Sequence, residues 1–222
     1  MNCAALILLR GGSKGLPGKN LKLLHDKPLY AWVVDEAQKS GLFPEIYIST
    51  ESDKVKLSIA RRYGSRIQIL DRPDWLASDE TSSDEVVKFH LSEIRAEIIC
   101  LIQATSPLTR AGQFRQALKK MRDEECDSLL TATRQRMFIW RPDGTAVNYD
   151  PACRPRRQEF AGEMVENGAF YLTKRWVWEK YANRLGGKIA LYEMDAEQAI
   201  EIDTHFDWKI IDAIVSDNEK NS

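Results

Sequence analysis

A run of glycines and cations follows the first apolar segment of the chain and spans Arg10–Asn20. Glycines allow backbone N–H groups to turn toward phosphate oxygens, and nearby cations balance the phosphate charge. Arg10, Lys14 and Lys19 supply three such cations. Without a bound anion these charges would repel one another, which disfavours the alternative of a plain solvent-exposed turn. The run therefore predicts a loop that holds a triphosphate.

Two familiar phosphate-binding patterns do not match this loop. A Walker A motif, G-x-x-x-x-G-K-[ST], would need glycine at Ser13 and a hydroxyl at Asn20. A dinucleotide fingerprint, G-x-G-x-x-G, fails because Gly11-Gly12 is followed by Ser13-Lys14. The sequence thus excludes a P-loop NTPase and a standard dinucleotide site at this position.

The elements around the loop indicate where it lies. Cys3–Leu9 is almost wholly apolar and ends at glycines, which is typical of a strand buried on both faces. Strand and helix patterns then alternate as far as Thr133, which favours an α/β fold with a mostly parallel sheet and helices on both faces. Ligands of such sheets bind beyond the carboxyl ends of the strands, where the loop is expected.

Further strands are expected at Glu45–Ser49, Arg66–Leu70, Ile98–Ile102, Asp127–Thr133, Gly168–Thr173 and Lys188–Met194. Helices are expected from Pro28 to Gly41, over Asp53–Tyr63, after a capping box of Ser82 and Glu85, over Gln113–Arg122, through Trp176 and Tyr181, and after Asp203.

The character of the sequence changes between Arg134 and Arg157. This stretch contains six arginines and no lysine, and three prolines and a glycine interrupt it. Proline and glycine at such spacing break regular structure. We therefore expect a single domain over residues 1–222 with an inserted arm at about 137–167.

Composition narrows the class of protein. The formal net charge of −1 argues against a dedicated nucleic-acid binder, whose affinity depends on neutralising phosphates. The four cysteines are isolated, with no C-x-x-C pair, so neither a zinc site nor a disulfide scaffold is expected and a reducing compartment is favoured. The sequence shows no charged-then-apolar leader and no apolar run near ~18 residues, which predicts a soluble cytoplasmic protein that does not bind a membrane.

Further sequence segments follow the loop and, together with it, resemble the motifs of a known family in the same order. The loop resembles the R-G-G-S-K-G-x-P-x-K-N signature of the CMP-sialic acid synthetases, the N-acylneuraminate cytidylyltransferases. Ile102–Pro107 is similar to the family's I-Q-x-T-S-P segment, and Ile200–Trp208 resembles its D-I-D-x-x-x-D segment. Arg154–Gln158 with Glu166–Tyr171 resembles the R-P-R-R-Q…E-N-G-x-F-Y segment of the animal-type members. The resemblance covers nearly the whole chain and implies a three-layer, Rossmann-like nucleotidyltransferase domain.

The resemblance also implies which residues hold the nucleotide. In this family the glycine loop wraps the phosphates of CTP, and a later polar loop holds the cytidine. Thr81 stands where the family usually has serine, and a threonine hydroxyl can keep the same hydrogen bond. Capping of the following helix by Ser82 or Ser83 is compatible with this contact. The implied nucleotide-binding residues are Arg10, Gly12, Ser13, Lys14, Gly15, Asn20, Arg72, Thr81 and Ser83, with Lys14 and Lys19 as phosphate cations.

Sugar, charge-stabilising and metal-binding residues follow from the same resemblance. Gln103 would orient the sugar, because an amide both donates and accepts hydrogen bonds. Arg156 or Arg157 would contact the sugar acid and, together with Lys19, act in catalysis by stabilising charge at the reacting phosphate. In a separate segment, Asp203 and Glu201 would bind Mg²⁺ or another divalent cation. The family usually has aspartate at position 201, so Asp203 is the better-matched ligand.

The implied reaction joins CTP to a sialic acid and gives CMP-sialic acid and pyrophosphate. The sequence leaves the choice among N-acetylneuraminate, its glycolyl form and KDN open. In this family the inserted arm packs against a second subunit, so a homodimer is expected. For Asp207, a favourable charge at a helix N-terminus is preferred to a role as metal ligand.

Other interpretations stay open at this point. The acceptor could be a related ulosonic acid, or the protein could bind a sugar nucleotide without catalysis because Glu201 departs from the family pattern. Arg154–Arg157 is also typical of a nuclear-localisation or nucleic-acid patch, which would add to the catalytic role. His25, His90 and His205 form no cluster and are interpreted as structural.

Overall fold

The computed structural model describes residues 2–12 and 15–220, and within them the core is a seven-stranded sheet with the strand order β5-β4-β1-β6-β8-β7-β9. The order follows from crossovers on either side of the first strand, β1. Neighbouring strands are parallel except at β8, which is antiparallel to both β6 and β7. The expected mostly parallel sheet is therefore confirmed. The strands are β1 (Cys3–Leu8), β4 (Ile46–Thr50), β5 (Gln68–Asp71), β6 (Ile98–Ile102), β7 (Ser128–Gln135), β8 (Glu163–Lys174) and β9 (Ile189–Met194).

Helices cover both faces of this sheet, as the alternating pattern predicts. Alternate side chains of β1 enter different clusters, because successive residues of a strand point to opposite faces: Ala5 packs with the helices α1, α2 and α4, and Leu6 packs with α3 and α5. A third cluster joins Leu16 of the glycine loop to Ile202 and Trp208 near the end of the chain. The helices are α1 (Leu29–Ser40), α2 (Asp53–Tyr63), α3 (Ser83–His90), α4 (Ala111–Asp123), α5 (Arg175–Tyr181) and α6 (His205–Lys220).

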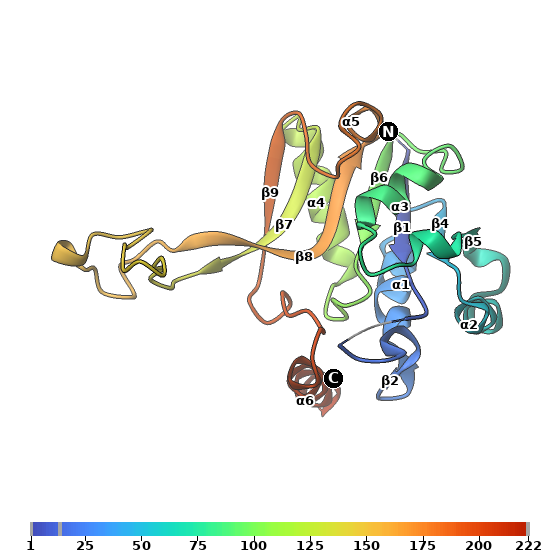
Figure 1. The fold of residues 1–222 in the computed structure, drawn as a ribbon, viewed down its shortest axis with the longest axis horizontal. Coiled ribbons are helices and arrows are strands. Elements are labelled where there is room, and N and C mark those ends of the chain that lie inside the picture. The colour runs from blue at the N-terminus through green and yellow to red at the C-terminus, as the bar shows by residue number, and fades with distance from the viewer. Residues whose placement is uncertain (1, 13–14, 221–222) are drawn as a thin grey trace.

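The carboxyl ends of the parallel strands share one edge of the sheet. Figure 1 shows α6 and the short hairpin of β2 (Leu23–Leu24) and β3 (Lys27–Pro28) beyond this edge. At the same edge α3 begins with the expected capping box, in which the backbone N–H of Ser82 donates to Glu85 (2.7 Å) and that of Glu85 donates to Ser82 Oγ (3.2 Å). The predicted start of this helix is confirmed. Among the described residues no helix is long and apolar enough to cross a membrane.

An arm projects from the sheet between β7 and β8, where the sequence predicts an insertion (Figure 1). The two strands continue beyond the body as a paired ribbon, with Ala132 opposite Glu166 and Gln135 opposite Glu163. The strand expected at Gly168–Thr173 is therefore only the body half of the longer β8. Its other half is largely exposed, so it lacks the apolar run that marks a buried strand.

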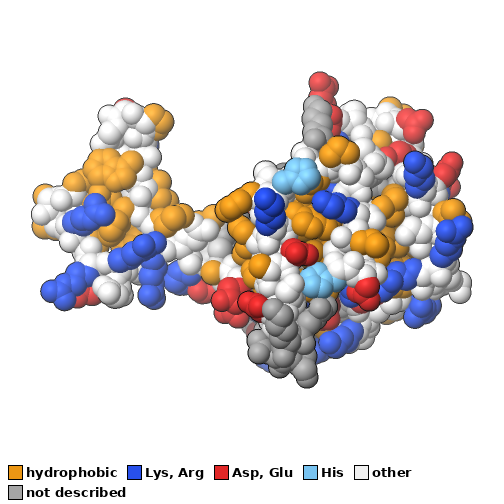
Figure 2. All heavy atoms as spheres, turned by 90° about the horizontal axis from the view of Figure 1, so that it is seen from below, with side chains coloured by type: hydrophobic (Ala, Val, Ile, Leu, Met, Phe, Trp, Pro, Cys, Tyr) orange, Lys and Arg blue, Asp and Glu red, His pale blue; other side chains and the backbone are white. Residues whose placement is uncertain are grey.

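Aromatic side chains give the arm a small packed centre of its own. The ring of Phe138 lies 4.4 Å from that of Tyr149 and 5.0 Å from that of Phe160, between centroids, and the guanidinium of Arg154 stacks 4.3 Å above Phe138. Hydrophobic and basic side chains also gather on the surface of the arm, as Figure 2 shows. The large exposed hydrophobic residues there are Met137, Ile139, Trp140, Val147 and Val165.

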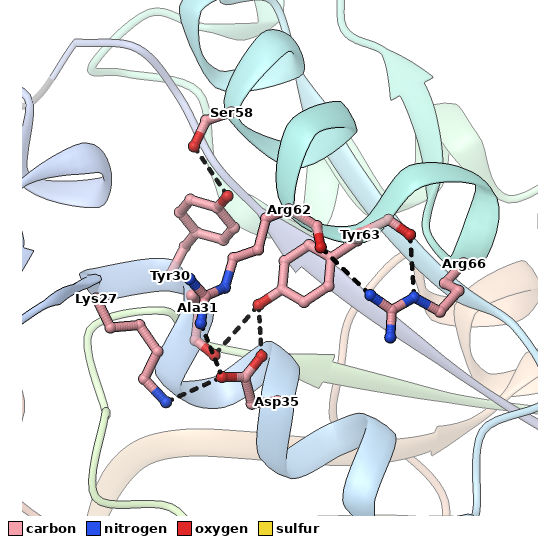
Figure 3. A network of polar contacts seen from close by, with 8 residues as sticks. All are labelled: Lys27, Tyr30, Ala31, Asp35, Ser58, Arg62, Tyr63 and Arg66. Carbon is pink, nitrogen blue, oxygen red and sulfur yellow. Dashed lines mark hydrogen bonds and ion pairs between the residues drawn. The ribbon is translucent and has the colours of Figure 1, made fainter.

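A network of polar contacts fixes α1 and α2 to the hairpin that follows the glycine loop (Figure 3). Asp35 on α1 accepts hydrogen bonds from Tyr63 Oη on α2 (2.6 Å) and from Lys27 Nζ on β3 (2.9 Å). Burial alone would raise the pKa of Asp35, but the hydrogen bonds from Tyr63 and Lys27 hold it below its ordinary value. The carboxylate is thus the common acceptor that links three elements.

We predict that Asp35→Asn lowers the free energy of unfolding by about 2 kcal/mol at neutral pH, because the carboxylate accepts charge-assisted hydrogen bonds that an amide supports poorly. A lowered folded-state pKa contributes stability above the ordinary value and loses it as pH falls through the lowered value. The difference from wild type, measured by urea unfolding, should therefore shrink below about pH 4.

The matched control is Glu179→Gln on α5, whose half-exposed carboxylate lies 3.8 Å from Arg175. We expect a change within about 0.5 kcal/mol for this exposed pair. An Asp35→Asn protein as stable as the control at neutral pH would contradict the network's role.

Candidate active site

A cleft of about 500 Å³ opens at the carboxyl edge of the sheet, with Leu8 of β1 and Gln103 after β6 on its walls. Because parallel strands end together there, segments that are distant in sequence meet around one space. Nine of the residues predicted from the sequence line it: Arg10, Gly15, Lys19, Asn20, Arg72, Thr81, Ser83, Gln103 and Asp203.

The first turn of the glycine loop is held by groups at the end of β4. The backbone N–H of Leu9 donates to the carbonyl of Ser49 (2.9 Å), and that of Gly11 donates to Glu51 Oε1 (2.5 Å). A Cβ on Gly11 would lie only 2.8 Å from that of Ser52, so this position has no room for a side chain. The loop therefore leaves β1 in a path set by its neighbour strand.

The second half of the loop rests on the segment that precedes α6. A Cβ on Gly15 would overlap the carbonyl oxygen of Asp203. Lys19 Nζ donates to the carbonyl of Ile202 (2.8 Å) and pairs with Asp203 Oδ1 (3.0 Å). Asn20 Nδ2 donates to the carbonyl of Arg10 (3.0 Å) and so closes the loop on itself. Lys19 and Asp203 stand side by side at the cleft as a result.

Two arginines face the cleft with different surroundings. Arg10 Nη1 pairs with Asp79 Oδ1 (2.6 Å), and both side chains are about one-third exposed, at 33% and 37%. Arg72, which follows β5, is only 7% exposed, and burial lowers the pKa of its guanidinium. The first is an exposed cation at the mouth, and the second is a buried cation in the wall.

Polar residues of the loop before α3 form the opposite wall. Thr81 Oγ1 lies 2.8 Å from Ser78 Oγ and donates to the carbonyl of Trp75 (3.3 Å). Ser82 caps the helix, which leaves Ser83 at the first helical position lining the cleft. Capping and cleft formation thus coexist in one loop, although direct contact of these hydroxyls with a nucleotide stays a prediction.

Gln103 lies directly after β6, at the carboxyl edge of the sheet. Its backbone N–H donates to the carbonyl of Ala169 (3.0 Å), which extends the pairing of β6 with β8. The side chain lines the cleft together with Thr105. Its role in orienting a sugar stays a prediction.

Glu201 lies beside the cleft rather than on its wall. It borders a second cavity with Glu166 and Asn167, and its Oε1 packs so closely on Gly168 that a Cβ there would overlap it. Burial, and to a lesser extent the charge of Asp203, raise the pKa of Glu201 to about 7. The Glu201 carboxyl group is thus packed beside the cleft, and its role as a cation ligand stays a prediction.

The carboxylate of Asp203 suits a hard cation better. Its side chain is 69% exposed at the cleft, where Mg²⁺ could share it with substrate phosphate and water. Among the described residues no group of three or more His, Cys, Asp and Glu side chains could by itself hold a metal ion. The donor set fits a cation that arrives with a phosphate substrate, held by Asp203 alone.

Asp207 has the structural role that the sequence favours. Its Oδ2 accepts hydrogen bonds from the backbone N–H groups of Asp203 (3.0 Å) and Thr204 (2.7 Å) at the start of α6. Desolvation opposes ionisation, but the hydrogen bonds from Thr204 and the backbone hold the pKa of Asp207 below its ordinary value. This carboxylate stabilises the helix terminus.

The arm holds two of the predicted catalytic residues apart from the cleft. Arg156 and Arg157 line a cavity on the arm with Phe138 and Trp140, and Arg157 Nε donates to the carbonyl of Arg136 (3.1 Å). Figure 1 shows the arm extending away from the body, so one chain does not bring these arginines to its own cleft.

The glycine loop contains the remaining predicted residues. Gly12 is exposed and does not line the cleft, and a Cβ there would meet no atom within 4 Å. Ser13 and Lys14 lie outside the described residues.

Two acidic residues of the site were not singled out from the sequence. Glu51 holds Gly11, and Asp79 holds Arg10. A signal for Glu51 exists, because it directly follows a predicted strand at the ligand-binding edge of the sheet. Asp79 lies in the polar loop that the family resemblance marks, but its partner is 69 residues away and no spacing rule connects them.

The fold and the cleft define an α/β protein with a polar cleft at the carboxyl edge of its sheet. Comparisons with known proteins specify its family. The sequence model of the cytidylyltransferase family matches residues 4–212. The chain belongs to the cytidylyltransferase family. It is 35% identical to N-acylneuraminate cytidylyltransferase A of Danio rerio and 37% identical to N-acylneuraminate cytidylyltransferase of Oncorhynchus mykiss. Each alignment covers 93% of this chain and 49% of the relative, so the chain spans about half the length of these relatives.

A solved structure shares the fold at low sequence identity. The structure of CMP:2-keto-3-deoxy-manno-octonic acid synthetase complexed with CTP superposes with a TM-score of 0.76 at 18% identity, and the match covers 98% of this chain and all of that one. The Rossmann-like nucleotidyltransferase fold expected from the sequence is confirmed.

We predict that Gly15→Ala weakens CTP binding roughly tenfold, because the added methyl group would push the loop off the carbonyl of Asp203 and shift Lys19. Isothermal titration with CTP measures the change. Gly112→Ala in α4 is the matched control, since a Cβ there meets no atom within 4 Å, and its affinity should equal that of wild type. Equal affinities for both variants would show that the loop does not need its contact with Asp203.

Proposed function

We propose that this protein transfers CMP from CTP to an N-acylneuraminate and releases pyrophosphate. The observation that carries the proposal is the gathering of Lys19, Arg72, Gln103 and Asp203 around one cleft at the carboxyl edge of the sheet. Relatives named N-acylneuraminate cytidylyltransferase support the choice of both substrates.

The chemistry needs positioning and charge stabilisation rather than a protein nucleophile. The anomeric hydroxyl of the sugar acid attacks the α-phosphorus of CTP; the new O–P bond forms as the bond to pyrophosphate breaks, and the hydroxyl proton is released. Lys19, held at the cleft by Ile202 and Asp203, would offset the charge that grows on the departing pyrophosphate. Arg72 would hold the cytidine, and Gln103 would orient the sugar.

Magnesium, or another divalent cation, is part of the proposal. Asp203 would hold it, and the bound cation would neutralise phosphate charge. Lys19 pairs with the same Asp203 carboxylate. When a cation binds that carboxylate, the Lys19 ammonium would be free to turn toward a phosphate. Glu201 would act through its neighbours rather than as a ligand, since its carboxyl group packs on Gly168.

A second subunit would complete the site. Arg156 and Arg157 lie on an arm that leaves the body, and exposed apolar residues surround them. In a homodimer the arm of one subunit would cover the partner and bring an arginine to its cleft. Arg154 stacks on Phe138, and Arg157 donates a hydrogen bond to Arg136. These contacts within the arm favour a folded arm over an exposed patch that binds nucleic acid.

An intracellular location, cytoplasmic or nuclear, belongs to the same proposal. The four cysteines all fall in the described part of the chain and are free. Cys3, Cys100 and Cys126 are buried, where burial raises the pKa of the Cys3 thiol to about 12 and keeps it unreactive. Free thiols suit a reducing compartment.

We predict that pyrophosphate release requires CTP and an N-acylneuraminate together with Mg²⁺. The assay combines each of ATP, GTP, UTP and CTP with N-acetylneuraminate, its glycolyl form, KDN and 2-keto-3-deoxy-manno-octonate. Activity with the last acid alone would move the assignment to a related ulosonic acid. CTP binding without turnover on any of these acids would instead indicate a non-catalytic sugar-nucleotide binder.

We further predict that two inactive variants restore activity when they share a dimer. Lys19→Ala damages the cleft, and the double variant Arg156→Ala/Arg157→Ala damages the arm. If the arm serves the partner, a mixed dimer contains one intact site of two, so the isolated mixed dimer should show about one-half of wild-type activity. Co-expression with two affinity tags isolates the mixed dimer.

The control pairs Lys19→Ala with a chain that carries all three substitutions, which leaves no intact site in any arrangement. A fully active monomer, or no recovery in the mixed dimer, would contradict the proposed sharing.

A further inference from the structure

A line of buried polar side chains runs from the wall of the cleft toward the end of α3. Arg72 Nε donates to Ser49 Oγ (3.1 Å), and its Nη2 donates to the carbonyl of Ser49 (2.9 Å). Ser49 Oγ lies 2.9 Å from His90 Nε2, and His90 Nδ1 lies 2.6 Å from Glu93 Oε1. Ser49 and His90 are both 0% exposed.

The donors and acceptors of this line assign one arrangement of protons. Arginine can only donate, and a carboxylate such as Glu93 can only accept. His90 therefore carries its proton on Nδ1, toward Glu93, and its Nε2 accepts the hydroxyl proton of Ser49. Ser49 Oγ in turn accepts from Arg72. With a neutral imidazole, this arrangement gives both ring nitrogens of His90 and the Ser49 hydroxyl a hydrogen-bond partner.

Serine, histidine and a carboxylate in this order also occur in hydrolases, but this line does not perform that chemistry. The Ser49 hydroxyl is completely buried and already serves Arg72 as acceptor, so it cannot reach a substrate. A nucleophilic serine needs access to the bond it attacks. The role of this line of side chains must therefore be to position other residues of the protein.

The line of polar side chains also connects the parts of the cleft wall that would face the nucleotide. The carbonyl of Ser49 also accepts the backbone N–H of Leu9 (2.9 Å), the residue from which the glycine loop departs. His90 ends α3, whose first turn begins at Ser83 on the other wall of the cleft. Ser49 thus joins the loop, Arg72 and α3 in one rigid unit.

We propose that His90 is a positioning residue for the nucleotide, acting through Ser49 to hold the guanidinium of Arg72 in the cleft wall. The inference rests on the proposed function, in which Arg72 contacts the cytidine of CTP. Arg72 has a long, flexible side chain, and its guanidinium makes both of these hydrogen bonds to Ser49. The direction of the guanidinium therefore depends on the orientation of Ser49 Oγ. His90 fixes that direction by accepting the hydroxyl proton.

The test compares variants that cut the line at different points. Ser49→Ala and His90→Phe should each raise the KM for CTP about tenfold by misplacing Arg72, with the KM for N-acetylneuraminate changed less than about twofold. His90→Gln should stay close to wild type, because its amide oxygen can accept from Ser49. Ser128→Ala is the matched control, since it removes another buried hydroxyl, bonded to the carbonyl of Gly186 (2.8 Å) and remote from Arg72.

A double-mutant cycle separates positioning from general loss of packing. In a Ser49→Ala background the His90→Phe change should have no further effect on the KM for CTP, because the line is already cut. Additive effects, or an unchanged KM for CTP in Ser49→Ala, would overturn the inference. If His90→Phe does not fold, Ser49→Ala and His90→Gln still decide it.

Titration of the wild-type protein with CTP distinguishes this failure from that of the proposed function. A wild type that does not bind CTP overturns both. A wild type that binds and turns over CTP, while Ser49→Ala keeps the same KM, overturns only the role of His90.

Discussion

Lys19 and Asp203 meet across 184 residues of sequence, and the candidate site depends on that contact. The ammonium group of Lys19 bonds both the carboxylate of Asp203 and the carbonyl of Ile202, while Gly15 packs directly on the backbone of Asp203. Beneath them Leu16 and Ile202 share a hydrophobic cluster with α6. Without this apolar base the second half of the glycine loop would lose the surface on which it rests, and Lys19 would lose its defined direction.

Two carboxyl groups two residues apart differ in environment: Asp203 is exposed beside Lys19, and Glu201 is buried against Gly168. Burial raises the pKa of Glu201 to about 7. Asp203 therefore faces the cleft, whereas Glu201 packs beside it.

Strand direction decides what the arm can do. Because β8 is antiparallel to both of its neighbours, its paired ribbon with β7 extends past the sheet and holds Arg156 and Arg157 outside the cleft. In the proposed function these arginines would therefore serve the cleft of a second subunit. The aromatic packing of Phe138, Tyr149 and Phe160 makes the arm a defined shape that a second subunit could meet.

The order of elements, a glycine loop after β1 and the capped start of α3 were all predictable from the sequence, because local rules govern them. Strands and helices have their own periodicities, and the box of Ser82 and Glu85 acts over three residues. The long β8 was only half predicted, since its arm half is exposed and carries no apolar pattern.

Contacts between distant segments were decided by the tertiary structure alone. No local rule relates Arg10 to Asp79, Glu51 to Gly11, or His90 to Arg72 through Ser49. The burial that turns His90 into part of a polar line, and Glu201 away from the cleft, exists only once the sheet has assembled. By itself the sequence determined which groups are available for nucleotide chemistry. The packing of strands and helices decided which of them face one another, because hydrogen bonds and desolvation act over a few ångströms of space and not over positions in a chain.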